Sequence, residues 1–282
     1  MTPVPPIKLA PHDSALGRWE SIARRPHPAA VDLSFGYQGF CGEMRLRREL
    51  HLPSGFPAIV VNFDAPFVVS DPAGGQVPVV CSDICFMGVH SSPFVTDTPA
   101  RRDLLVVNLT PIGARRLLGA PMSEMTNKWL PLADIVGRRA KELIGRLHDA
   151  KDWRARFSTL DDFLLTGSAA MSAPRRDLSS AWRWMSGGGA AATLARGLDV
   201  SHKHLIDQFR DQIGLPPKLV GRLARFNRVL RLPQHGGEPD WAGAAQTCGY
   251  FDQAHMINEF RDFAGATPGA LAKRRAAFTL RA

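Results

Sequence analysis

The chain has 282 residues and a formal net charge of +9, with 45% hydrophobic and 22% charged residues. This composition is ordinary for a soluble globular protein, and the length allows two domains with cores of their own. No apolar run reaches the roughly 20 residues that cross a bilayer, and the start lacks the pattern of a signal peptide. The four cysteines (Cys41, Cys81, Cys85 and Cys248) are too few for a disulfide framework. We therefore expect a cytoplasmic protein with no membrane partner.

Residues 31 to 110 are predicted to form β-strands. Short β-branched runs at 58–63, 66–69, 77–80 and 104–107 alternate with stretches rich in Gly, Pro, Asn and Asp. Several short strands separated by turn signals are typical of a β-sandwich or a cupin-like barrel.

The hydrophobic period changes near residue 111, where helices are predicted over 111–118, 132–150 and 153–165. A stripe of Ile135, Leu143, Ile144 and Leu147 is more typical of a core-facing helix surface than of a dimer seam. The small, polar segment 166–174 is the best candidate for a linker. Residues 1–170 are thus expected to form one domain, and residues 175–277 a second, all-helical one.

The positive charge is concentrated after this linker. Residues 175–282 hold 16 Lys and Arg against 9 Asp and Glu, whereas the preceding 174 residues hold 19 against 17. Such asymmetry between the halves of a chain indicates a polyanionic partner for the basic half.

The second half also contains an internal repeat. The segment Phe209-Arg210-Asp211, with Gly214 and Pro217 after it, recurs 51 residues later as Phe260-Arg261-Asp262, Gly265 and Pro268. A Ser or Asp that can cap a helix stands eight positions before each Phe, and each Gly can end that helix in the left-handed conformation. A helix punctuated in this way and preceded by a tight turn is typical of a helix-turn-helix.

We therefore predict two helix-turn-helix units. The first has helices at 191–196 and 201–213 around a turn at 197–200, and the second has helices at 241–247 and 252–264 around a turn at 248–251. A further helix over 177–185, a Gly-rich break at 186–189 and a long joining helix over 218–232 complete this domain.

This doubled unit, with its FRD-x-x-G-x-x-P endings and Gly249-Tyr250-x-Asp252-Gln253-x-His255 before the second copy, resembles the AraC/XylS family of bacterial transcription regulators. The resemblance covers about the last 100 residues. It implies an α+β two-domain protein with a β-rich regulatory domain, trailing helices and a double helix-turn-helix domain. Two recognition helices would enter successive major grooves on one face of double-stranded DNA, about 34 Å apart.

The resemblance also implies site residues, which we carry over position by position. The base-facing positions are Lys203, Ile206 and Asp207 in the first recognition helix and Gln253, Ala254, His255 and Asn258 in the second. The arginines expected on phosphates are Arg210, Arg222, Arg225, Arg228 and Arg261. Gln253 can pair bidentately with adenine, and Lys203 can approach guanine. Two departures from the family pattern concern the first unit: Asp207 repels phosphates unless it accepts from a cytosine amino group, and Asp199 replaces the usual turn glycine. The first helix is therefore expected to give affinity more than specificity.

No metal, cofactor or catalytic site is predicted. Cys81 and Cys85 are a lone pair at Cys-x3-Cys spacing, and His51 and His90 are isolated in the sequence. No nucleophile elbow, phosphate loop or dinucleotide fingerprint is present.

The predicted function is a sequence-specific transcription regulator rather than an enzyme. RNA polymerase is an implied partner, and a small-molecule effector and a homodimer stay open. Two alternatives also stay open. One is a DNA-targeted enzyme of the alkylation-repair type, with Cys41, Cys81 or Cys85 as methyl acceptor. The other is a sequence-indifferent architectural protein.

Overall fold

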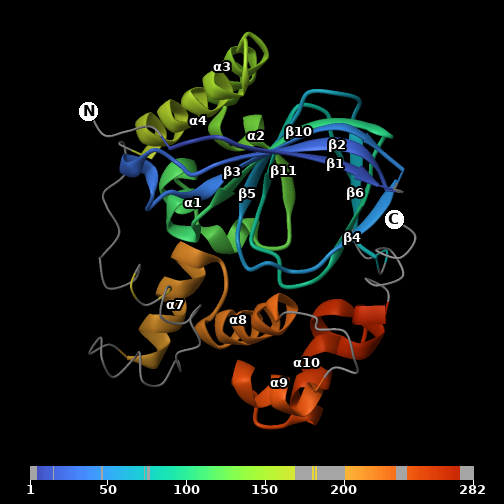
Figure 1. The fold of residues 1–282 in the computed structure, drawn as a ribbon. Coiled ribbons are helices and arrows are strands. Elements are labelled where there is room, and N and C mark those ends of the chain that lie inside the picture. The colour runs from blue at the N-terminus through green and yellow to red at the C-terminus, as the bar shows by residue number, and fades with distance from the viewer. Residues whose placement is uncertain are drawn as a thin grey trace.

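A computed structural model describes residues 5–14, 16–45, 47–72, 74, 77–168, 180, 182, 201–232 and 240–273. A β-rich domain lies above a helical domain in Figure 1, and α1 and α7 lie side by side where the two meet. The α+β architecture with a β-rich first half and a helical second half, predicted from the sequence, is confirmed.

Two antiparallel sheets form the β-rich domain. In spatial order, the larger sheet contains β1 (Lys8–Ser14), β2 (Gly17–Arg24), β3 (Ser34–Met44), β10 (Arg101–Leu109), β5 (Ala58–Asn62), β8 (Ile84–Met87) and β11 (Trp129–Pro131). The smaller sheet contains β4 (Arg48–His51), β9 (Phe94–Asp97), β6 (Phe67–Ser70) and β7 (Val79–Cys81). The predicted start of the strands at residue 31 is wrong, because β1 and β2 precede it. β1 is exposed along almost its whole length and β2 alternates between exposed and half-buried residues in its first half, so neither contains an apolar run that would indicate a strand.

Side-chain alternation along the central strands divides the core in two. On β10, Leu105, Val107 and Leu109 join the large cluster that the helices cover, while Leu104 and Val106 pack against a second cluster. The second cluster lies on the opposite face, where Phe67 and Phe94 of the smaller sheet meet Trp129 of the larger. Successive residues of a strand point to opposite faces, so a near-continuous apolar strand serves both clusters.

Five helices cover the large cluster or connect its parts: α1 (Pro111–Leu118), α2 (Leu132–Val136), α3 (Arg138–His148), α4 (Trp153–Ser168) and the short 3-10 helix η2 (Met122–Met125), with a second 3-10 helix, η1, at Pro28–Ala30. The single helix predicted over 132–150 is wrong. Gly137, with φ of 58° and ψ of −131°, separates α2 from α3. The interpretation of the α3 stripe as a core face is confirmed, because Leu143 and Leu147 are buried against the core.

The helical domain consists of α7 (His202–Ile213), α8 (Pro217–Arg231), α9 (Trp241–Cys248) and α10 (Gln253–Ala264). Each helix predicted in these ranges is confirmed to within two residues. Ser201 and Asp252 cap α7 and α10 by accepting from the backbone N–H of His204 and His255. The predicted helix at 191–196, the turn at 197–200, the Gly-rich break and most of 177–185 lie outside the described residues. So does most of the predicted linker, although α4 extends through Ser168.

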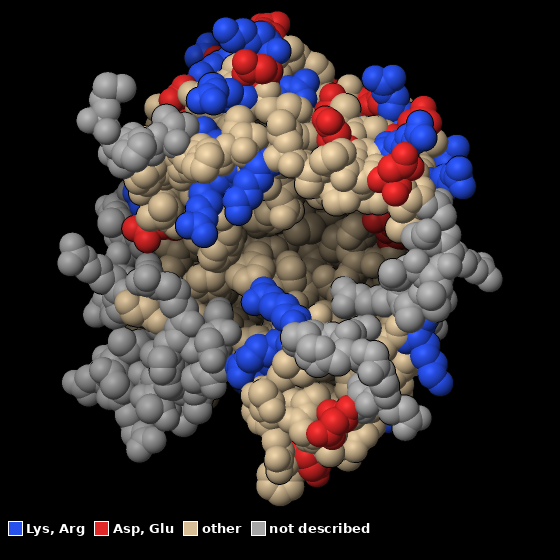
Figure 2. Space-filling model, in the orientation of Figure 1, with Lys and Arg blue, Asp and Glu red and all other residues tan. Residues whose placement is uncertain are grey.

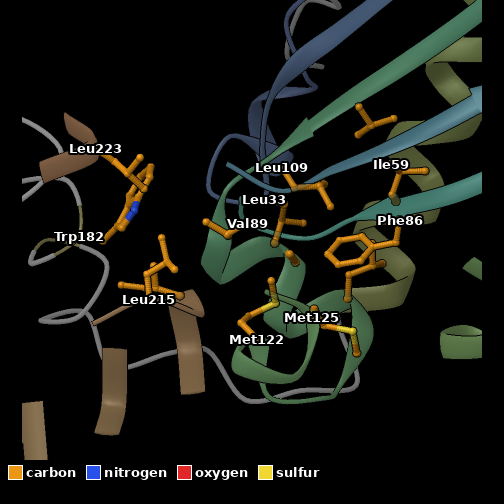
Figure 3. Packing of buried hydrophobic residues seen from close by; sticks show 14 of the residues in the cluster. Leu33, Ile59, Phe86, Val89, Leu109, Met122, Met125, Trp182, Leu215 and Leu223 are labelled. Atoms are coloured by element: carbon orange, nitrogen blue, oxygen red, sulfur yellow. The ribbon is translucent and has the colours of Figure 1, made fainter. Parts of the chain in front are cut away.

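The two domains share one apolar cluster. Leu33, Val89 and Met122 of the first domain belong to the same cluster as Leu215 and Leu223 of the second, as Figure 3 shows. Because burial of apolar area is the dominant favourable term in association, this shared core fixes the helical domain against the sheet domain. No helix among the described residues is long and apolar enough to cross a membrane.

Candidate DNA-binding surface

The second predicted recognition helix, α10, has one buried face and one exposed polar face. Met256, Phe260 and Phe263 are buried. Of the predicted base-facing residues, Gln253, Ala254 and Asn258 are exposed and His255 is half-buried. The cap at Asp252 and the left-handed Gly265 (φ 63°) define the two ends of this helix. The helix therefore presents its first turn and its polar face outward, as a base-reading helix requires.

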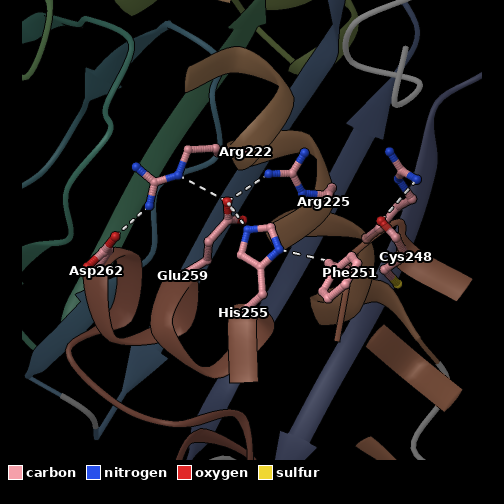
Figure 4. Close-up of polar contacts among 8 residues, drawn as sticks. Arg222, Arg225, Cys248, Phe251, His255, Glu259 and Asp262 are labelled. Carbon is pink, nitrogen blue, oxygen red and sulfur yellow. Dashed lines mark hydrogen bonds and ion pairs between the residues drawn. The ribbon is translucent and has the colours of Figure 1, made fainter. Parts of the chain in front are cut away.

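A buried carboxylate fixes α10 to the joining helix α8. The Glu259 side chain is 4% exposed, and its Oε1 accepts from Nε of Arg222 at 3.0 Å and from Nη2 of Arg225 at 2.7 Å. Nε2 of His255 lies 3.4 Å from the same oxygen, as Figure 4 shows. Burial raises the pKa of Tyr250, and the nearby Glu259 charge raises it further, so this phenol stays neutral. We name Arg222, Arg225, His255 and Glu259 the Glu259 clamp.

The joining-helix arginines thus face the second unit. Beyond the clamp, Arg222 pairs with Asp262 at 2.5 Å and lies 5.0 Å from the ring centre of Phe263. Nη1 of Arg228 donates to the carbonyl oxygen of Cys248 at 3.3 Å. These guanidinium groups hold α9 and α10 in place. Their contact with phosphates stays a prediction.

The first predicted recognition helix, α7, is positioned by the sheet domain. Lys203, Asp207 and Arg210 are exposed and Ile206 is half-buried. At the other end of the helix, Asp211 pairs with Arg115 of α1 at 3.4 Å. The hydroxyl of Thr126 donates to the carbonyl oxygen of Gly214 at 2.9 Å. The C-terminal end of α7 is therefore held against the sheet domain, while Lys203, Asp207 and Arg210 stay exposed.

The joining helix also touches the sheet domain. Nδ2 of Asn227 donates to the carbonyl oxygens of Pro53 at 3.1 Å and Ser54 at 3.3 Å. A movement of the 53–56 loop would therefore displace α8, the helix that joins the two helix-turn-helix units.

Sequence reasoning missed three residues of this surface. Glu259 stands four positions after His255, a helical spacing that brings side chains together. This spacing could have predicted the contact between the two side chains. Asp211 and its partner Arg115 are 96 residues apart, and nothing in the sequence links them. Phe251 is 90% exposed, and its place directly before the Asp252 cap was visible in the sequence.

Of the cysteines and histidines in the sheet domain, Cys81, Cys85 and His90 are buried, His51 is half-buried, and Cys41 is half-buried near charged side chains. Cys81 and Cys85 are buried, as predicted. Burial raises the pKa of the Cys41 thiol, which opposes the thiolate that a methyl acceptor needs. The structure brings His51 and His90 to one ring, since each imidazole centre lies 4.8 Å from that of Phe94. Burial lowers the pKa of both histidines, and among the described residues no three metal-ligating side chains gather.

Comparison with known proteins agrees with this geometry. A family model described as "Helix-turn-helix domain" matches residues 194–274, and one described as "Domain of unknown function (DUF6597)" matches residues 41–131. A search of the curated proteins found no match. Among solved structures, ToxT from Vibrio cholerae aligns at 11% identity over 83% of this chain and 97% of its own, with a TM-score of 0.46. A protein described as a predicted oxalate decarboxylase from Thermotoga maritima aligns at 17% identity over 36% of this chain and 94% of its own, with a TM-score of 0.27.

The matched domain, its two capped recognition helices and the helix between them define a DNA-binding transcription regulator. Both helix-turn-helix units of this domain end in the FRD-x-x-G-x-x-P segment. Residues 194–274, which match the helix-turn-helix model, are the part of the chain that contains the repeat resembling the AraC/XylS family.

Proposed function

We propose that the protein recognises a specific DNA sequence through α7 and α10, which enter successive major grooves of one duplex face. The observation that supports this most is the exposed polar face of α10, held in one orientation by the Glu259 clamp. A base-reading helix needs such a fixed orientation, because a bidentate contact tolerates little rotation.

The two helices would contribute differently to the free energy of binding. On α10, Gln253 pairs with adenine and Asn258 extends the contact along the groove, while the ring nitrogens of His255 face Glu259 and the Phe251 N–H. On α7, Lys203 approaches guanine, Ile206 contacts a thymine methyl group, and Asp207 accepts from a cytosine amino group. The exposed Arg210 and Arg261 contact phosphates, which position the protein without specifying sequence.

A duplex selected from random DNA and a scrambled duplex of the same length test this proposal. We expect the selected duplex to bind at least 1,000-fold more tightly at physiological salt. Equal affinity for both duplexes would instead support the architectural alternative. Methyl transfer from alkylated DNA to Cys41, Cys81 or Cys85 would support the repair alternative.

We further propose that the sheet domain modulates DNA binding through a small-molecule effector. A cavity of about 730 Å³ lies between the first strands and the end of α8, and Figure 2 shows the surface hollowed between the domains, with Lys and Arg on both sides. Lys8, Arg25 and Arg231 line this cavity, Phe35 and Phe56 form its apolar wall, and none of the described residues that line it is a carboxylate. Arg24 also lines it but pairs with the buried Asp161.

Three cations beside an aromatic wall fit an anion with an apolar body. Calorimetry with decanoate tests this assignment, and decyltrimethylammonium, which has the same chain with the opposite charge, is the control. We expect decanoate alone to bind. The double substitution Arg25→Gln/Arg231→Gln should weaken binding at least tenfold, and Lys141→Gln on α3 should not. Binding of both amphiphiles would show that the cavity selects the apolar chain and not the negative charge, and would contradict this assignment.

An effector at this place would act on the C-terminal end of the joining helix α8. It would tie Arg231 of α8 to Lys8 of β1 and to Arg25, which follows β2, and so favour one arrangement of the domains over others. RNA polymerase is the partner that a promoter-bound protein of this class would meet. A homodimer would contact two copies of the recognised DNA sequence.

A further inference from the structure

Phe251 is an apolar side chain that the fold leaves in solvent. It is 90% exposed, and the other large exposed hydrophobic residues among those described, such as Leu9, Phe35 and Val80, belong to the sheet domain. Burying a Phe side chain stabilises a folded protein, so the exposure of Phe251 leaves that stabilisation unused. A single exposed apolar residue is common on protein surfaces. Phe251 differs in its position, because it directly precedes the cap of α10.

The turn that carries Phe251 is held in one conformation. Gly249 ends α9 in the left-handed region with φ of 83°, and the next residue, Tyr250, is buried against the His255 ring at 5.3 Å. The backbone N–H of Phe251 points to Nδ1 of His255 at 3.5 Å, a contact drawn in Figure 4. Because Tyr250 occupies the inward place of the turn, the ring of Phe251 projects from the surface.

The neighbours of Phe251 on this surface are the residues that the proposed function places on bases. Asp252 caps α10 with its carboxylate, and Gln253 and Ala254 follow, both exposed. Phe251 precedes the cap and Ala254 follows Gln253, so exposed apolar residues stand on both sides of Gln253 in the sequence. The N-terminal residues of a recognition helix contact base edges in the major groove. The only apolar group on that edge of a base pair is the 5-methyl group of thymine.

We propose that Phe251 is a specificity-determining residue that packs on a thymine methyl group at the edge of the groove that α10 enters. Together with Gln253 on an adenine, it makes the half-site under α10 a sequence rich in A·T pairs, with a thymine at one fixed position. This inference rests on the proposed function and adds the chemistry of the second half-site.

Deoxyuridine tests the contact directly, because it differs from thymidine only by the missing methyl group. In the selected duplex, each thymidine of the α10 half-site is replaced in turn, and the affinity of the full chain is measured. We expect one replacement to weaken wild-type binding about fourfold, the value of burying one methyl group. The variant Phe251→Ala should bind the thymidine duplex more weakly and show no further loss with deoxyuridine at that position. Phe251→Leu, which keeps an apolar side chain, should retain part of the thymidine preference.

Val80→Ala is the matched control, since Val80 is also an exposed apolar residue, 55% exposed, but lies on β7. It should leave every affinity unchanged. Full affinity of Phe251→Ala, with sequence preference intact, would overturn this inference alone. Weaker binding of Phe251→Ala with an unchanged deoxyuridine penalty would mean that the ring meets deoxyribose, and would also overturn it. A wild type without sequence preference would overturn the proposed function first.

Discussion

The two helix-turn-helix units are copies in sequence but are supported in different ways. The second unit is held by the Glu259 clamp, whose buried carboxylate takes Arg222 and Arg225 from α8. The first unit is held by the sheet domain: Arg115 of α1 pairs with Asp211, and the hydroxyl of Thr126 donates to the carbonyl oxygen of Gly214. One repeat can thus supply a unit that the helical domain itself orients and a unit that the sheet domain orients. We infer that specificity resides in the former and that regulation acts on the latter.

The largest effect is expected from breaking the clamp. Glu259→Ala removes the shared partner of two arginines that are only 24–28% exposed, and should lower the free energy of unfolding by roughly 2–4 kcal/mol. Urea unfolding of the full chain measures this value. Asp262→Asn is the control, because its pair with Arg222 lies at the surface with Asp262 61% exposed, and should cost less than about 1 kcal/mol. Similar values for both would mean that the buried carboxylate does not orient α10.

Gln253→Ala sharpens the comparison on the DNA side. It should weaken binding to the preferred site by roughly 1–3 kcal/mol and relax the requirement for adenine there. The corresponding change in the first unit, Lys203→Ala, should reduce affinity for all duplexes more evenly. Competition binding with single-base variants of the site distinguishes the two results. Intact selectivity in Gln253→Ala would show that α10 is turned differently in the groove.

Arg261→Ala separates phosphate contact from clamping. Arg261 is exposed on α10 and outside the Glu259 clamp, so its loss should weaken all duplexes alike and reduce the slope of log K against log salt by about 1. Arg225→Ala should also weaken all duplexes, but together with a loss of stability, since Arg225 donates to Glu259. An unchanged salt slope in Arg261→Ala would remove this residue from the phosphate contacts.

Asp211→Asn gives the smallest expected effect. Its ion pair with Arg115 is partly exposed, with Asp211 38% exposed, so the free energy of unfolding should fall by less than about 1 kcal/mol. The informative measurement is the effector dependence of DNA binding, which should decrease because this contact connects α7 to the sheet domain. An undiminished effector response would place the connection elsewhere, for example at Asn227 and the 53–56 loop.

Local rules were enough to predict α7, α8, α9 and α10, the helices that the structure describes in the second half. The caps at Ser201 and Asp252, the glycines after α7 and α10 and the apolar spacing within each helix are short-range signals, and the structure follows them. The same rules failed where tertiary context decides. β1 and β2 lack an apolar run, and Gly137 divides a helix whose hydrophobic period continues across it.

The site was predictable as a set of exposed positions but not as a set of contacts. Helical periodicity placed Ala254, Asn258 and Arg261 outward with Gln253 beside them, and all four are exposed. It could not show that Arg222 and Arg225 turn toward Glu259, because they lie 37 and 34 residues from it in the chain. A basic helix looks the same in sequence whether its guanidinium groups face a phosphate or a buried carboxylate.

Selection of bound duplexes from random DNA tests the central claim most directly. We expect two conserved half-sites about one helical turn apart, with the bases under α10 more strictly constrained than those under α7 and a fixed thymine among them. Enrichment without any consensus would contradict sequence-specific recognition. A consensus confined to the α7 half-site would contradict the assignment of base reading to the clamped second unit.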